Sequence, residues 1–256
     1  SRIAILDNFC WGNPDKPDRL GSLVRCAEGC YKIALDYGVP FISGKDSLYN
    51  EYTQGKKSIA IPGTILISAI GIIEDVTKCV TMDFKRAGNL IYLAGTTGEE
   101  MGGSIYLDTF GLLGANVPKV NAKQAMKIFQ ALHKAVKAGT VASSHDCSDG
   151  GFGTALAEMA FAGNLGAAVR LDKVHYRGKA KRDDYILFSE SNSRFVVEVD
   201  PQQQKNFEKI MKGLPFSRIG RVEEPPEFVI YGMRKNVCVQ AAIDDLKKAW
   251  QKPLQW

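Results

Sequence analysis

Apolar and polar positions along the chain switch repeatedly between the period of a strand and the period of a helix. The short apolar runs 2–6 and 39–43 are typical of strands. Between them, residues 19–37 place apolar side chains at spacings of three and four, which predicts an amphipathic helix. Gly38 then stands where a left-handed C-terminal cap is expected. A β-rich run at 64–76 completes a β-α-β-β beginning.

The rest of the chain continues this alternation. Further strands are expected at 89–95, 167–171, 194–199, 218–222 and 228–231. Further helices are expected at 122–136, 152–162, 202–212 and 244–250. Strands and helices that alternate in this way favour an α/β or mixed α+β fold.

A polar stretch around residues 83–88 indicates a domain boundary. We therefore expect a partial first domain at 1–82, a second domain at 83–235, and a tail strand and helix at 236–256. The chain starts without an initiator methionine and without the order of a signal peptide. We expect it to begin at or just before a strand, inside a larger domain.

Composition excludes several classes of protein. The net charge is +5, but the basic residues are dispersed and form no stripe, so no nucleic-acid partner is predicted. No apolar run is long enough to span a bilayer, so no membrane partner is predicted either. The six cysteines form no C-x-x-C pair. They are expected to be buried free thiols in a reducing compartment, the cytoplasm.

Glycine-rich turns are the first candidates for chemistry. One is Gly44 to Ser47, and two others contain the pairs Gly102 and Gly103, and Gly150 and Gly151. Backbone N–H groups in such turns can surround phosphate oxygens, so these glycines are candidate phosphate loops. Neither G-x-x-x-x-G-K-[ST] nor G-x-G-x-x-G occurs, so no P-loop and no dinucleotide turn is predicted.

Carboxylates near these turns could hold Mg²⁺, which prefers oxygen ligands. Asp7, Asp46, Asp146 and Asp149 all fall at predicted strand ends or in loops. Each also has a structural alternative: Asp149, for instance, could cap the helix that follows it.

The segment Ser189-Glu190-Ser191 could hold a substrate hydroxyl or phosphate. Ser189 is not predicted to be a nucleophile, because no serine-histidine-aspartate order and no G-x-S-x-G turn is visible. His145 could be a base or an orienting donor, although a lone histidine is more often structural.

Several longer motifs resemble one known family. Residues 7–17 (DNFCWGNPDKP) and 41–51 (FISGKDSLYNE) closely resemble phosphoribosylformylglycinamidine synthase, synthetase subunit. The same order continues through 145–163 (HDCSDGGFGTALAEMAFAG), 188–195 (FSESNSRF) and 246–250 (LKKAW). The resemblance thus covers nearly the whole chain. Ser-Asp-Gly-Gly alone is shared by the wider aminoimidazole ribonucleotide synthetase superfamily.

The resemblance implies a fold and an activity. Family members contain two homologous halves, and this chain resembles the second, as a truncated N-terminal synthetase-like α/β part followed by a complete C-terminal α/β sandwich domain. The implied reaction is an ATP-dependent ligation in purine biosynthesis, in which formylglycinamide ribonucleotide and glutamine-derived ammonia give the amidine. The implied cofactors are ATP and Mg²⁺. The implied partners are the ribonucleotide substrate, a glutaminase subunit or domain and the N-terminal half of the same protein, with a homodimer as a further candidate assembly.

The resemblance also implies roles for single residues. Asp7 and Gly44 would contact the nucleotide, and Ser47 would contact the substrate, as Ser189 and Glu190 could. Relatives carry an asparagine that holds magnesium where this chain has Lys45. Lysine cannot bind Mg²⁺ and would instead neutralise a phosphate, which leaves Asp46 and Asp149 as candidate metal ligands. The catalytic base is expected in the other half, so no catalytic residue is assigned, and this chain alone is expected to be inactive.

Two alternatives remain at this point. The chain could belong to another ATP enzyme of the superfamily, such as thiamine-monophosphate kinase or selenophosphate synthetase, although residues 7–14 argue against this. It could also be a non-catalytic half that holds a structural nucleotide and docks the glutaminase. The central expectation is that the turns opening at Asp7 and Gly44 converge in space.

Overall fold

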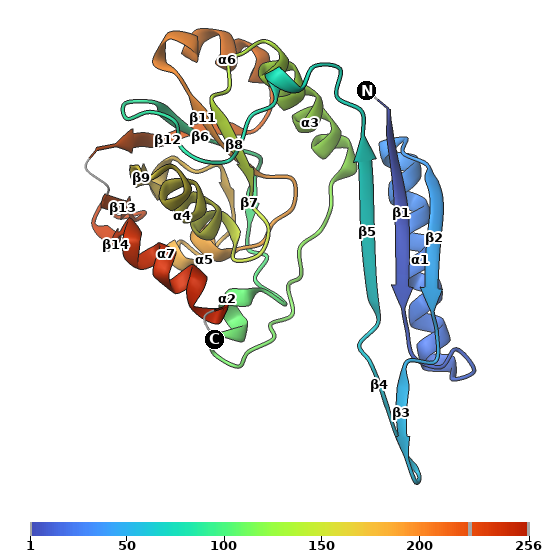
Figure 1. The fold of residues 1–256 in the computed structure, drawn as a ribbon. Coiled ribbons are helices and arrows are strands. Elements are labelled where there is room, and N and C mark those ends of the chain that lie inside the picture. Colours follow the sequence, from blue (N-terminus) through green and yellow to red (C-terminus); the bar gives the residue numbers. More distant parts are fainter. Residues whose placement is uncertain (1, 225–226, 255–256) are drawn as a thin grey trace. The chain divides into compact units, whose positions relative to one another are not determined.

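The computed structural model describes residues 2–224 and 227–254 and divides into two compact units (Figure 1). The first unit runs through Val76 and the second begins at Thr77. Residues 77–82 therefore lie with the second unit and not, as the sequence placed them, with the first. The reason is packing: Val80 lies against the core of the second unit, and the backbone N–H of Ser144 donates to the carbonyl of Thr81.

The first unit is built on a three-stranded sheet in the order β2-β1-β5. Strand β1 is parallel to β2 and antiparallel to β5. The helix between β1 and β2 follows the β-α-β order that parallel neighbours require. The elements are β1 (Ile3–Cys10), α1 (Pro17–Tyr37), β2 (Phe41–Ser47), β3 (Glu51–Gln54), β4 (Lys57–Ala60) and β5 (Thr64–Gly71).

The first two strands are longer than the sequence predicted. We expected β1 to end before Asp7 and β2 to end at a turn beginning with Gly44, but both strands continue through these residues. The reason is their mutual pairing, which supplies backbone hydrogen bonds as far as Cys10 and Ser47. Gly44 to Ser47 is thus strand, and the predicted glycine turn there is wrong. The hairpin of β3 and β4 was not predicted.

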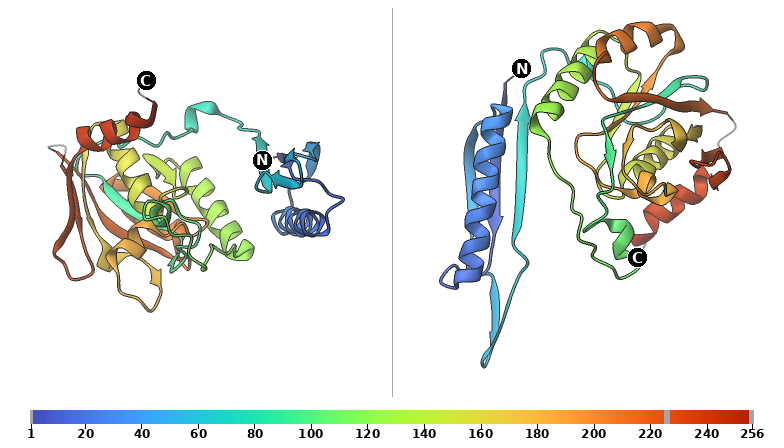
Figure 2. Two further views of the ribbon diagram at one scale, coloured as in Figure 1. Left: turned by 90° about the horizontal axis from the view of Figure 1, so that it is seen from below. Right: turned by 180° about the vertical axis from the view of Figure 1, so that it is seen from behind.

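Helix α1 covers one face of this sheet (Figure 2). Pro17 stands in its first turn, and Gly38 ends it with φ of 64°, as predicted from the sequence. The indole N–H of Trp11 donates to Ser22 Oγ of α1 at 2.9 Å. Phe9 and Trp11 are buried on this side, so the odd-numbered positions of β1 point toward the helix.

The second unit is built on a seven-stranded mixed sheet in the order β14-β13-β9-β12-β6-β11-β8. Its strands are β6 (Leu90–Ala94), β8 (Ser143–Asp146), β9 (Gly166–Arg170), β11 (Phe195–Val199), β12 (Phe216–Glu223), β13 (Glu227–Tyr231) and β14 (Val237–Ala242). The short strands β7 (Thr97–Gly98) and β10 (Tyr176–Arg177) pair separately.

Helices lie on both faces of the seven-stranded sheet (Figure 1). They are α3 (Ala122–Lys137), α4 (Gly151–Gly163), α5 (Asp183–Phe188), α6 (Gln204–Met211) and α7 (Ile243–Gln251), whereas the short helix α2 (Ile105–Asp108) contributes no residue to either core. Short 3₁₀ turns occur at Val76–Lys78, Leu171–Lys173, Pro201–Gln203 and Lys252–Leu254. The tail strand and helix expected at 236–256 are thus part of the sheet and of its cover.

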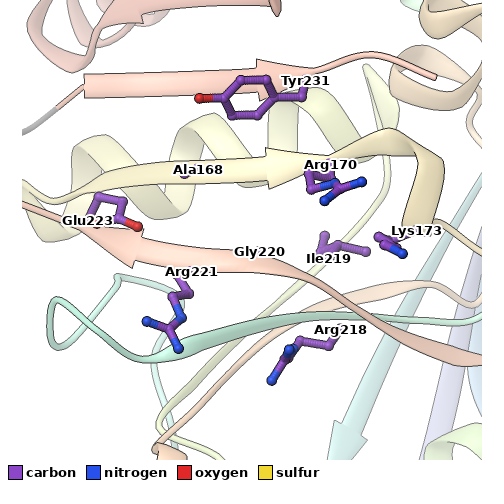
Figure 3. Close-up of a pocket in the computed structure, with 9 residues that line it drawn as sticks. All are labelled: Ala168, Arg170, Lys173, Arg218, Ile219, Gly220, Arg221, Glu223 and Tyr231. Atoms are coloured by element: carbon purple, nitrogen blue, oxygen red, sulfur yellow. The ribbon is translucent and has the colours of Figure 1, made fainter. Parts of the chain in front are cut away.

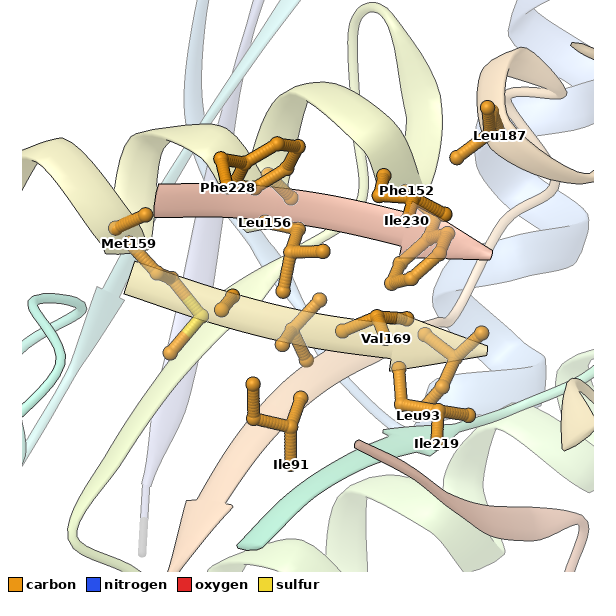
Figure 4. Packing of buried hydrophobic residues seen from close by; sticks show 14 of the residues in the cluster. Ile91, Leu93, Phe152, Leu156, Met159, Val169, Leu187, Ile219, Phe228 and Ile230 are labelled. Carbon is orange, nitrogen blue, oxygen red and sulfur yellow. The ribbon is translucent and has the colours of Figure 1, made fainter. Parts of the chain in front are cut away.

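Strand β6 shows how the two cores form. Ile91 and Leu93 point to one face and pack with Phe152 and Leu156 of α4 (Figure 4). The alternate positions of β6 point to the other face, where Tyr92 and its neighbours pack with α3 and α6. A fully apolar strand between two helical layers is what a doubly covered sheet requires.

Glu198 of β11 is a buried carboxylate that binds the segment before β6 to the large sheet. It accepts hydrogen bonds from the backbone N–H groups of Lys85 and Arg86, from the Asn89 amide at 2.7 Å and from the Ser143 hydroxyl at 2.6 Å. Buried carboxylates are tolerated when their oxygens are satisfied in this way.

Two expectations from composition can be checked here. Within residues 2–224 and 227–254, no helix is both long and apolar enough to cross a bilayer. All six cysteines are free thiols. Cys147 is buried as expected, whereas Cys79 is exposed, so the prediction of burial holds only in part.

Candidate functional site

Asp7 and Gly44 lie directly opposite each other across the parallel pair of β1 and β2. A Cβ added to Gly44 would stand 1.8 Å from Oδ1 of Asp7, so the carboxylate lies over the glycine backbone. Glycine leaves room for the carboxylate in this position, and a larger residue would displace it. The two segments therefore converge as the sequence predicted, although as paired strands and not as turns.

Residue parity divides the predicted site residues of β1 and β2 between the two faces of the sheet. Asp7 has the parity of the buried Phe9 and points toward α1. Burial, then the neighbouring Cys26 and then the charge of Asp7 raise the pKa of the Cys30 thiol on that helix. Asp46, paired with Phe9, shares this face. Lys45 and Ser47 point to the opposite face, and the Lys45 ammonium donates to Ser47 Oγ.

No helix among residues 2–76 covers the face away from α1. Leu66 and Ile70 of β5 are 59% and 60% exposed and share the parity of Lys45 and Ser47 through their pairing with β1. Exposed apolar residues beside charged ones are typical of a surface that another element covers.

Glu51 organises the loop between β1 and α1, a role that was not predicted from the sequence. Its carboxylate accepts from the ammonium of Lys16 at 2.5 Å, from Arg19 Nε at 2.9 Å and from the backbone N–H of Asn13 at 2.9 Å. The Lys16 contact, then those from the Ser58 hydroxyl and from Asn13, lower the pKa of Glu51 to about 2. Only the hairpin, which was missed, brings Glu51 to this loop.

In the second unit, Glu190 joins two of the predicted glycine turns. Its Oε1 accepts from the backbone N–H of Gly150, at the start of α4, and from the N–H of Ile105, at the start of α2, at 2.9 Å each. Gly102 and Gly103 directly precede this second turn. The structure therefore brings Glu190 and the two turns together, and a protein carboxylate already occupies N–H groups that could otherwise have held phosphate.

The glycines of these turns have conformational and packing reasons to be glycine. Gly103 and Gly150 have φ of 74° each, which side chains rarely adopt. A Cβ on Gly151 would stand 2.5 Å from the carbonyl oxygen of Ser189, and one on Gly102 would stand 2.8 Å from the backbone of Asn116. Asp149 makes no side-chain cap of α4, because Gly150 is the N-cap residue.

Arg194 supports the Ser189-Glu190-Ser191 segment through hydrogen bonds, a role that was not predicted from the sequence. It is fully buried and donates to the carbonyl oxygens of Ser189 and Ser191 and, at 3.0 Å, to the hydroxyl of Thr97. Burial lowers the pKa of its guanidinium, yet arginine stays charged at neutral pH. Ser189 in turn accepts from the backbone N–H of Glu100 at 3.2 Å. Ser189 is therefore a buried structural link.

Small-molecule sites typically have a volume of about 300–1,000 Å³, and a cavity of ≈ 330 Å³ lies beside Glu190. Asp146, Ser148, Asp149 and Glu190 line one part of it, and Arg194 lines another. A hydrogen bond from the Ser148 hydroxyl lowers the pKa of Asp146, whereas burial acts in the opposite direction. The lining thus combines acidic groups with hydroxyls and one buried cation.

The two metal ligands predicted from sequence lie in different units of the chain. Asp46 lies in the first unit and Asp149 in the second, and both are exposed. Across the described part of the chain, no group of three or more histidine, cysteine, aspartate or glutamate side chains has the arrangement of a metal site. Asp7 and Asp46 do share one face of the first sheet, so two oxygen ligands are available there, and phosphate oxygens would have to complete the shell.

His145 has structural partners. Its ring nitrogens lie 2.9 Å from Glu158 Oε2 of α4 and 3.2 Å from Asp146 Oδ1. Glu158 also accepts from the indole N–H of Trp250 at 3.0 Å, which ties α7 to α4. These contacts favour the structural reading of His145.

Comparison with known proteins identifies relatives. The chain is 34% identical over 259 aligned residues to phosphoribosylformylglycinamidine synthase subunit PurL of Deinococcus radiodurans, a match that covers 99% of this chain and 34% of the relative. The chain thus spans about one third of the length of that relative.

Solved structures share the fold. The complex of Thermotoga maritima PurL with FGAR matches with a TM-score of 0.74 and 22% identity, over 96% of this chain and 40% of that chain. Escherichia coli HypE, a hydrogenase maturation protein, matches with a TM-score of 0.68 and 16% identity, over 93% of this chain and 73% of that chain. The mixed α/β fold class predicted from the sequence is confirmed by these similarities.

Most of the second unit also matches one family model directly. Residues 86–232 match the family described as AIR synthase related protein, C-terminal domain. This span contains six of the seven strands of the large sheet (all but β14), the helices from α2 to α6 and the region around Glu190. The resemblance seen in the motifs is thereby confirmed, and the chain belongs to the family of AIR synthase related proteins through its C-terminal domain.

Proposed function

We propose that this chain is the C-terminal part of the synthetase subunit of phosphoribosylformylglycinamidine synthase. The whole enzyme would convert formylglycinamide ribonucleotide, ATP and glutamine-derived ammonia to formylglycinamidine ribonucleotide, ADP and phosphate in purine biosynthesis. The observation that carries this proposal is the position of the Asp7 carboxylate over Gly44, within the motifs of residues 7–17 and 41–51. The relative from D. radiodurans, aligned over 99% of the chain, supports it.

A magnesium nucleotide fits the face of the first sheet that α1 covers. Asp7 and Asp46 offer two carboxylates there, and the Asp7 carboxylate lies over the backbone of Gly44. When bound, Mg²⁺ would neutralise phosphate oxygens during transfer of the terminal phosphoryl group to the substrate amide. T. maritima PurL has been solved with ATP and with ADP, which supports ATP as the nucleotide.

The opposite face of the same strands suits an anionic substrate. Lys45 supplies a positive charge and Ser47 a hydroxyl, and the two are already in contact. Such a pair can bind a phosphate through charge and a directed hydrogen bond. We assign the ribonucleotide to this face, by the strand end at Ser47, and the T. maritima PurL complex with FGAR supports that class of substrate. Ser189 and Glu190 would support the substrate indirectly, through the backbone that they hold.

The uncovered face of the first sheet would dock the N-terminal half of the same protein. About two thirds of the length of the D. radiodurans relative lies outside this chain, and exposed residues such as Leu66 and Ile70 need a cover. A glutaminase would join the assembly, as the T. maritima PurLQS structure suggests by its name. A homodimer through the same face is the competing arrangement. The free thiols fit the cytoplasm.

The test compares Asp7→Asn with Asp36→Asn in the full-length protein. Asp36 is exposed near the end of α1, and Asp36→Asn removes one negative charge from the same unit as Asp7→Asn does. Removal of one preorganised charged group typically lowers kcat by about 10²-fold or more, so Asp7→Asn should lower kcat/KM for ATP by about that factor, measured as ADP and amidine release. Equal rates in the two variants would reject the site.

The same experiment separates the scaffold alternative, which the capping role of Glu190 favours. If Asp7→Asn abolishes nucleotide binding but leaves amidine formation unchanged, the nucleotide is structural and this half is a scaffold. The 256-residue chain alone should form no amidine from ammonia and ATP, because the catalytic base is expected in the other half.

A further inference from the structure

One face of the seven-stranded sheet is covered only in part. Helices α3 and α6 pack over β6 and β11, where Tyr92 contacts Phe207. Beyond them, β9, β12 and β13 present a cavity of ≈ 310 Å³. Its lining contains four basic side chains and one acidic one, with a tyrosine at the edge (Figure 3). We call this cavity the arginine pocket; it is lined by Ala168, Arg170, Lys173, Arg218, Ile219, Gly220, Arg221, Glu223 and Tyr231.

A bulge in β12 is what brings two of the arginines to this face. Arg218 and Arg221 are three residues apart and would point to opposite faces of a regular strand. The register shifts between Arg218 and Gly220, so that Tyr92 pairs with Arg218 and Leu90 pairs with Arg221. Tyr92 and Leu90 are two residues apart and share a face, and the arginines therefore share it too. Bulges are often found where a side chain is re-aimed for function.

The floor of the pocket is formed by small residues: Ala168, which pairs with Arg221, and the neighbouring Gly220. A Cβ on Gly220 would stand 2.1 Å from the carbonyl oxygen of Ala168, so the two strands need glycine here. Small floor residues let a ligand reach the strand backbone while the arginines surround it. Tyr231, which pairs with Arg170, forms one wall with a ring that is 36% exposed.

The basic groups differ in their availability. Arg170 is held by Asp172 through two hydrogen bonds of 3.0 and 2.8 Å. Hydrogen bonds from Tyr92 and Gln204 lower the pKa of Glu208 of α6, and the charge of Arg218 adds a smaller contribution. Among the described residues, no carboxylate forms an ion pair with Arg218 or Arg221.

We propose that the arginine pocket binds a compound with two or more linked phosphoryl groups. Guanidinium groups match phosphate oxygens with paired hydrogen bonds, and two free arginines on one face can hold two phosphoryl groups. The volume lies at the lower end of the range for small-molecule sites. Glu223 repels an anion, so the phosphoryl groups lie toward Arg218 and Lys173. The ligand that carries these phosphoryl groups is either inorganic pyrophosphate or a nucleotide whose base contacts Tyr231.

The test titrates pyrophosphate and, separately, ATP into the 256-residue chain at constant salt, and follows the amide NMR signals of Gly220 and Ala168. These reporters respond to the arginine pocket and not to the site of Asp7 and Gly44, so failure of one proposal is distinguishable from failure of the other. ATP binding clearly tighter than pyrophosphate, and lost in Tyr231→Ala, assigns the nucleotide; equal affinities assign the phosphoryl groups alone.

The decisive variant is Arg218→Gln/Arg221→Gln, with Lys123→Gln/Lys127→Gln on the exposed side of α3 as the control of equal charge. Hydrogen bonds to charged groups contribute enough for each lost arginine to weaken binding about tenfold or more. The control should change affinity less than about twofold, since screened distant charges act weakly. Glu223→Gln should tighten binding. Equal weakening in the two double variants, or no response at Gly220 and Ala168, overturns the proposal.

Discussion

The two hydrogen bonds of Glu190 predict how two substitutions at one position will differ. Only Oε1 is used, toward the N–H groups of Gly150 and Ile105. Glu190→Gln keeps an oxygen that can accept both, and loses only the charge near the start of α4. A charge at a helix N-terminus contributes about 0.3–1 kcal/mol, so we expect the glutamine variant to be less stable by about 1 kcal/mol or less.

Glu190→Ala removes both acceptors. Hydrogen bonds to a charged group contribute about 1.5–3 kcal/mol each, and water can replace part of this because the cavity is open. We therefore expect the alanine variant to lose about 2–4 kcal/mol of unfolding free energy. Urea unfolding of the 256-residue chain, followed by tryptophan fluorescence and circular dichroism, measures both variants.

The contrast between the variants is the result that matters. If the alanine variant is as stable as the glutamine variant, Glu190 does not secure the two helix starts. If the glutamine variant is stable but the full-length enzyme loses activity with it, the charge serves a ligand in addition to the fold. Asp149→Asn, an exposed neighbour without a capping bond, is the matched control and should change stability little.

Three further predictions concern stability. The pKa of Glu51 is lowered to about 2 in the folded chain. Its contribution to the free energy of unfolding is therefore complete above the ordinary pKa near 4.5 and is lost as the pH falls from there toward 2. The urea midpoint should thus fall more between pH 6 and pH 3 for the native chain than for Glu51→Gln. Glu198→Gln places an amide N–H against donors and removes the charge that they bind, so unfolding should become easier by about 2 kcal/mol; Glu227→Gln, at the exposed start of β13, is the control. Phe152→Ala should remove about 3–5 kcal/mol from the fully buried core, and a loss below 1 kcal/mol would contradict the packing described for α4.

Much of the local structure could be predicted from the sequence. The helices at α1, α3, α4 and α7 carry the three-and-four spacing and begin or end within a few residues of the predicted bounds. Their periodicity is strong because each helix has one face toward a sheet. Gly38 could be placed as the cap of α1 for the same local reason.

Features that depend on distant partners could not be predicted. Strand β8, Ser143–Asp146, contains four polar residues and exists because it pairs with β11. The continuation of β2 through Gly44 depends on β1, and the convergence of Glu190 with two helix starts depends on the tertiary fold. Arg194 was overlooked because a lone arginine at the first position of a predicted strand carries no sign that it will be buried.

The pairing of β1 and β2 has a consequence for how these segments can vary. Deleting or inserting a single residue between Gly44 and Ser47 would reverse the direction of every side chain after it, exchanging Asp46 for its neighbours without altering composition. The number of residues in this segment is therefore as strict a requirement as their type. An uninterrupted motif keeps each side chain on the same face of the sheet.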